Sequence, residues 1–108
     1  MSNEPVSEQY RVVAKQWCDA EAAASLLEDT KSAMLSTRIR QLIEAEPGIA
    51  LNRAEAEVKS SDEWREWITS MIEARKKANL LKCQLEYLRM RHGEQQSAEA
   101  SKRAEMRL

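Results

Sequence analysis

The sequence predicts an all-α protein: a long antiparallel helical hairpin or coiled coil that forms an oligomer, with a short helix near its bend. Two observations predict this class. The 108 residues include only 2 glycines and 2 prolines, and Ala, Glu, Lys, Arg and Leu dominate, as in long helices and coiled coils. Apolar residues also recur at alternating spacings of three and four, which places them on one face of a helix.

The first long helix is predicted over residues 6–46. Its apolar positions before a shift of face are Val6, Tyr10, Val13, Trp17, Ala20, Ala24 and Leu27. Beyond Leu27 the apolar face moves to Leu35, Ile39 and Leu42, which is typical of a stutter where a helix turns a new face to its partner. Pro47-Gly48 is the strongest interior break and predicts the bend.

A second long helix is predicted over residues 61–92. Before it, a short helix begins near Asn52 or continues a neighbouring helix. Ser60 and Glu63 match a capping box at the start of the second long helix, and Gly93 is placed to end it in a left-handed cap. The apolar positions of this helix are Trp64, Trp67, Met71, Ala74, Ala78, Leu81, Leu85, Leu88 and His92.

Charged residues beside the two apolar faces predict one antiparallel register. It places Glu28 opposite Arg75 and Glu21 opposite Lys82. Each exposed ion pair contributes only ~0.2–1 kcal/mol, so such pairs select a register rather than drive folding.

The chain divides into a hairpin over residues 1–93 and a polar C-terminal helical segment over residues 94–108. A two-helix hairpin has a thin core, and small chains with thin cores often need a second subunit to be stable. We therefore expect a homo-oligomer.

No combination of residues predicts catalysis, and we expect no enzyme, metal or cofactor. His92 is the sole histidine, and its place at the end of a predicted helix favours a structural role. Cys18 and Cys83 match no zinc or redox spacing, and the two glycines form no phosphate-binding loop.

The first residues and the hydropathy of the chain predict a cytoplasmic protein that does not contact a membrane. The first ten residues, MSNEPVSEQY, lack the basic and apolar regions of a signal peptide. No apolar run approaches the ~20 residues of a membrane span.

A second apolar row runs along the predicted second helix, on the side that faces away from the first long helix. Its members are Leu80, Cys83, Tyr87 and Met90. Uncovered apolar patches of this kind mark interaction sites, so we expect these four residues to form the interface with a partner or with another subunit.

Basic residues on the same helix leave a second interpretation open. The candidate nucleic-acid contacts are Arg75, Lys76, Lys77, Lys82, Arg89 and Arg91. A basic helix face can dock on phosphates, but the net charge of the chain is only -1 and the signs are interleaved. We therefore favour a role for these residues beside the helix-helix contact, and nucleic-acid binding is the alternative.

The stretch EARKKANLLKCQLEYLRMRH, followed by EQQSAEASKRAEMRL, resembles uncharacterised small helical proteins of tailed bacteriophages and prophages. The resemblance covers the C-terminal third of the chain. It implies a phage-type accessory protein, with a host or phage protein as partner and no catalytic residues. The function we expect is protein-protein interaction, as an inhibitor or a scaffold; the alternative is a nucleic-acid-associated factor in phage recombination or replication.

Overall fold

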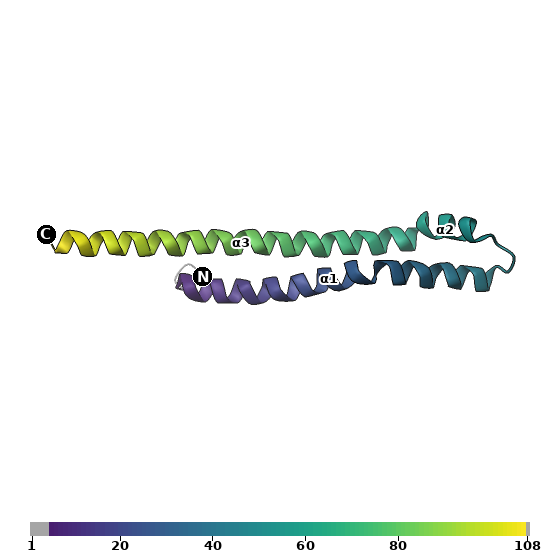
Figure 1. The fold of residues 1–108 in the computed structure, drawn as a ribbon, viewed down its shortest axis with the longest axis horizontal. Helices are drawn as coiled ribbons and strands as arrows, with labels where there is room; N and C mark the ends of the chain where they lie inside the picture. The colour runs from purple at the N-terminus through teal and green to yellow at the C-terminus, as the bar shows by residue number, and fades with distance from the viewer. Residues whose placement is uncertain (1–4, 108) are drawn as a thin grey trace. The chain divides into compact units, whose positions relative to one another are not determined.

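The computed structural model describes residues 5–107, which form three helices and no strand (Figure 1). Helix α1 spans Val6–Ala45, α2 spans Leu51–Lys59 and α3 spans Asp62–Met106. The predicted all-helical class is confirmed, and so is the short helix between the two long ones. The single hairpin predicted over residues 1–93 stays a prediction.

The helices contribute to two compact units. The terminal unit contains residues 5–20 and 77–107, and the central unit contains residues 21–76. In each unit, one stretch of α1 packs against one stretch of α3.

In the central unit the two stretches are antiparallel. Near the start of α3, Glu63 pairs with Arg38, and later in α3 Arg75 pairs with Glu28, which comes earlier in α1. The buried residues of this unit are Ala24, Ala54, Val58 and Trp64. Two of them lie on α2, whose four-residue spacing turns both toward the core.

The terminal unit also pairs α1 and α3 in opposite directions. Val6 and His92 line one groove, and Trp17 and Leu85 line another. Its core contains Val6, Val13 and Leu88, with Tyr10, Leu81 and Leu85 packed against them. The predicted apolar positions of both long helices are buried or half-buried in their own units, except His92, which is exposed.

The predicted end of α3 at Gly93 is wrong. The helix continues to Met106, past the N-terminal end of α1 in the terminal unit (Figure 1). An interior glycine costs only about 1 kcal/mol relative to alanine, and good helix formers follow it. His92 therefore lies inside a helix and not at the helix end where the sequence predicts it. Residue 108 lies outside the described residues.

The predicted cap of α3 is displaced by one residue. The hydroxyl of Ser61 accepts a hydrogen bond from the backbone N–H of Trp64 at 3.2 Å, so Ser61 caps α3. Ser60 is instead the C-cap of α2. The carboxylate of Glu63, expected to complete the capping box, pairs with Arg38 at 2.9 Å.

Substitution by alanine is expected to change the free energy of unfolding in opposite directions at the two glycines. Gly48 has a φ of 95°, and a side chain in a left-handed conformation costs about 1–2 kcal/mol. Gly93 is helical, and no atom lies within 4 Å of a Cβ added there. We expect Gly48→Ala to lower the free energy of unfolding by about 1–2 kcal/mol and Gly93→Ala to raise it by about 0.5–1 kcal/mol.

Urea unfolding of the two variants measures both changes against the wild type. The changes should have opposite signs. Equal shifts in the same direction would contradict the backbone conformations assigned to the two glycines.

Candidate interaction surface

Helix α3 has two apolar faces in the terminal unit. The inner face, which packs toward α1, contains Ala78, Leu81, Leu85 and Leu88, all buried or half-buried. The outer face carries the apolar row of Leu80, Cys83, Tyr87 and Met90. With 3.6 residues per turn, the two sets lie about half a turn apart.

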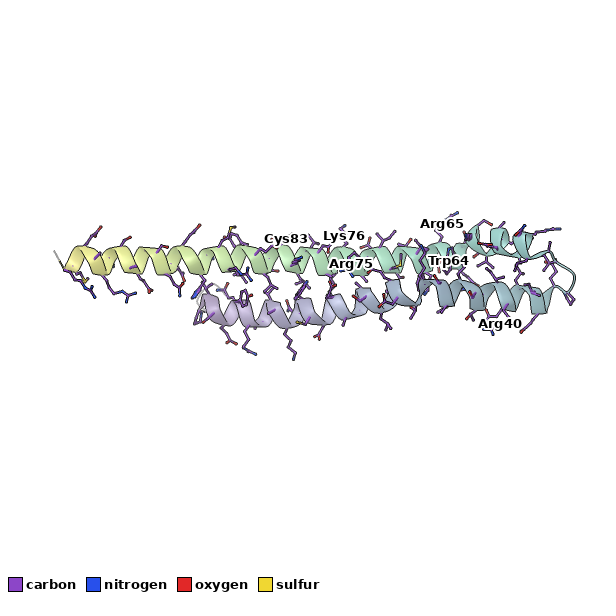
Figure 2. All side chains as sticks on the ribbon, in the orientation of Figure 1. Arg40, Trp64, Arg65, Arg75, Lys76 and Cys83 are labelled. Atoms are coloured by element: carbon purple, nitrogen blue, oxygen red, sulfur yellow. The ribbon has the colours of Figure 1, made fainter. Side chains whose placement is uncertain are left out.

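The apolar row is exposed in its own unit. Leu80 is 62% exposed, Tyr87 55% and Met90 61%, and the thiol of Cys83 is free and exposed. Figure 2 shows Cys83 on the side of α3 away from α1. The row is thus placed as the sequence predicts, and its binding role stays a prediction.

Polar residues border the apolar row on both sides. Asn79 and Glu86 lie along one edge, and Gln84 and Arg91 lie along the other, as the helical spacing requires. All four are exposed. No ion pair within residues 5–107 involves Glu86 or Arg91, so both charges remain available to a partner.

The strongest polar contact between the long helices surrounds Arg75 in the central unit. Its Nε and Nη2 donate to the two carboxylate oxygens of Glu28, each at 2.8 Å, and its Nη1 donates to Glu21 at 2.6 Å. The predicted pair of Glu28 with Arg75 is confirmed. The predicted partner of Glu21, Lys82, is wrong, because the planar guanidinium reaches carboxylates two turns apart on α1.

This cluster makes the stability of the central unit depend on pH. The hydrogen bond from Arg75 holds the pKa of the Glu28 carboxyl below its ordinary value of 4.5. The same contact, together with that to Glu21, raises the pKa of Arg75. A lowered carboxyl pKa stabilises the fold above the unfolded pKa, and this stability is lost as the pH falls through the folded pKa.

We expect Glu28→Gln to lower the melting temperature at pH 7, with the difference from wild type closing as the pH falls below 4.5. Thermal melts followed by circular dichroism across this range measure the difference. Glu66→Gln, at an exposed position of α3, is the matched control and should leave the melt unchanged. A difference that persists unchanged into acid would contradict the contribution assigned to this pair.

The candidate nucleic-acid residues fall into two groups. Arg75 is half-buried and paired, whereas Lys76 is exposed on the side of α3 away from α1 (Figure 2). In the terminal unit, the exposed members are Lys77, Lys82, Arg89 and Arg91. None of these four forms an ion pair within the described chain.

A shallow groove in the terminal unit was not predicted. Its volume is about 240 Å³, and its lining residues are Tyr10, Trp17, Lys82, Leu85, Glu86 and Arg89. The indole Nε1 of Trp17 is buried without a hydrogen-bond partner. The apolar spacing predicts Trp17 in the helix-helix contact. It does not predict that the half-buried indole leaves a groove beside it.

No group of three or more His, Cys, Asp or Glu residues in the described chain is placed to hold a metal ion. Among residues 5–107, no helix combines the length and the apolar character needed to cross a membrane.

Comparison of the chain with protein-family models, with curated proteins and with solved structures finds no significant match.

Proposed function

We propose that the chain is a non-enzymatic helical interaction protein that self-associates through the apolar row on α3. In the accessory role that the phage resemblance implies, the same surface presents a helix to host or phage proteins, as an inhibitor or a scaffold. One observation carries the proposal. Three large apolar side chains and an exposed thiol line one face of a helix whose other face is already packed.

Burial of this row supplies the free energy for association. Removing apolar surface from water contributes about 25 cal/mol per Å². Inside the two units the gain is small, because Ala24 and Ala54 in the central unit and Ala78 in the terminal unit are the only described side chains with no exposed surface. A thin internal core opposite an exposed apolar row favours a second interface over an isolated monomer.

Sedimentation velocity tests the proposal with two matched variants. Leu80→Glu places a charge in the row, and Leu26→Glu makes the same change at an α1 leucine that is 65% exposed. The wild type and Leu26→Glu should show a sedimentation coefficient that rises with protein concentration, and Leu80→Glu should stay monomeric. A wild type that is monomeric at every concentration, or equal losses in both variants, would overturn the proposal.

Nucleic-acid binding is the second candidate, since Lys77, Lys82, Arg89 and Arg91 are exposed and unpaired within the described chain. The interleaved acidic residues leave a net charge of -1, which opposes attraction to phosphates.

Titration of labelled single- and double-stranded DNA at two salt concentrations separates the two functions. We expect no binding tighter than about 100 μM even at low salt; about 100 μM is the weak limit of non-specific affinity at physiological salt. Tighter binding that weakens steeply with salt would establish the second function.

A further inference from the structure

We infer that the occupant of the apolar row is a second copy of this chain, paired parallel and in register through α3. The inference rests on the proposed function and adds the orientation and the register of the pair. It follows from the charges that border the row, which are complementary to a second copy in one orientation only.

The spacing of the row is that of a short coiled-coil heptad repeat. Leu80 and Tyr87 occupy the a positions of a heptad, and Cys83 and Met90 occupy the d positions, with spacings of three and four throughout. In this frame the residues at the g positions are Asn79 and Glu86. Those at the e positions are Gln84 and Arg91.

A parallel pair brings each g residue beside the e residue five positions later in the other chain, and these contacts set partner choice and orientation. Glu86 then meets Arg91 of the second copy, and the two-fold axis repeats this ion pair. Asn79 likewise meets Gln84 of the second copy, amide against amide. Both charges are exposed and unpaired within residues 5–107.

An antiparallel pair through the same row brings like charges together. In that orientation g positions face g positions and e positions face e positions. Glu86 would lie against Glu86 of the second copy, and Lys77 against Arg91 of the second copy. Like charges brought together across an interface are destabilising, so the charge pattern selects the parallel pair.

The length of the row predicts a weak dimer. From Leu80 to Met90 the helix rises about 15 Å, and the next residue on the same face is the exposed Glu94. In a parallel pair the two copies of Glu94 repel each other and end the contact. Interfaces below about 1,200 Å² belong to transient complexes, so the dimer should exchange rapidly with the monomer.

Single-cysteine cross-linking tests the orientation. In a Cys18→Ser/Cys83→Ser background, Leu80→Cys and Met90→Cys each carry one thiol on the row. A disulfide requires Cα atoms about 4.4–6.8 Å apart. In the parallel dimer each variant should form a covalent homodimer under mild oxidation. In an antiparallel dimer the like thiols are separated by about 15 Å along the axis, and only a mixture of the two variants should cross-link.

Charge exchange provides an independent measurement. Glu86→Arg and Arg91→Glu should each weaken the dimer in sedimentation experiments, and the double variant should restore wild-type association. Recovery in the double variant is specific to the parallel pairing, because neither single change alters the apolar row.

The outcomes separate the inference from the function on which it rests. A dimer that depends on Leu80 but cross-links only in the mixture would overturn the parallel register and leave the proposed function standing. A wild type that remains monomeric at every concentration would overturn both.

Discussion

Replacing Trp64 with alanine is expected to lower the free energy of unfolding by about 3–5 kcal/mol, the range for a buried large aromatic residue. Trp64 is only 6% exposed. Its ring stacks on that of Trp67 with centroids 5.2 Å apart and planes 3° apart, a contact that the smaller side chain abolishes. Trp64 is also the sole large buried aromatic residue in the described chain, so its loss removes the largest side chain from the core.

Urea unfolding of Trp64→Ala measures this loss, with Arg65→Ala as the control. Arg65 is exposed on the same turn, and its ion pair with Asp62 is long, at 3.7 Å. Exposed substitutions usually change stability by less than about 0.5 kcal/mol. A loss below about 1 kcal/mol for Trp64→Ala would contradict the packing of the central unit.

Leu88→Ala is expected to lower the free energy of unfolding by about 2–5 kcal/mol. Leu88 is 4% exposed, and with Val6 and Val13 it forms the core of the terminal unit. This unit has few large apolar residues, so the cavity cannot be filled from nearby side chains. The loss should be independent of protein concentration, because Leu88 faces α1 of its own chain.

Leu80→Ala removes the same atoms from the opposite face of α3. Since Leu80 is 62% exposed, we expect a change within about 0.5 kcal/mol in dilute protein and a larger loss only where the dimer forms. Guanidinium unfolding at two protein concentrations compares the variants. Equal, concentration-independent losses at the two leucines would show that α3 does not have one packed and one free face.

Much of the fold follows from apolar periodicity. The three-four spacing from Trp64 to Leu88 predicts the inner face of α3, because a helix that long has few other ways to bury so many apolar residues. The second row, from Leu80 to Met90, follows from the same spacing once the first is assigned. Exposure of this row in the structure agrees with its predicted position.

The helix ends follow less directly from the sequence. Gly93 carries a strong end signal, but a left-handed cap requires the chain to leave the helix, and nothing after Gly93 favours that. Ser60 and Ser61 each satisfy part of a cap motif, and local patterns do not separate adjacent serines. The carboxylate of Glu63 pairs with Arg38 instead, and Arg38 is too far away in the sequence for a local motif to indicate this contact.

The ion pairs show the same limit. The register predicts Glu28 beside Arg75 correctly because both flank the apolar faces at the same level. Which basic residue pairs with Glu21 depends on how far the side chain of Arg75 extends. Arg75 carries several N–H donors on a planar group and holds two carboxylates at once. One-to-one matching of charges along a sequence cannot anticipate such a shared partner.

Pairing of α3 with a second copy through the apolar row can be measured with the two native cysteines. Cys83 lies in the row, and Cys18 is exposed on α1. The alkylation rates of the two thiols in the wild-type protein can be measured separately by mass spectrometry. The protein concentration is varied from about 1 μM to about 1 mM, the range of dissociation constants of weak complexes.

We expect Cys83 to react progressively more slowly than Cys18 as the concentration rises, and Leu80→Glu to abolish this protection. A ratio of the two rates that stays constant across the whole concentration range would contradict pairing through the apolar row.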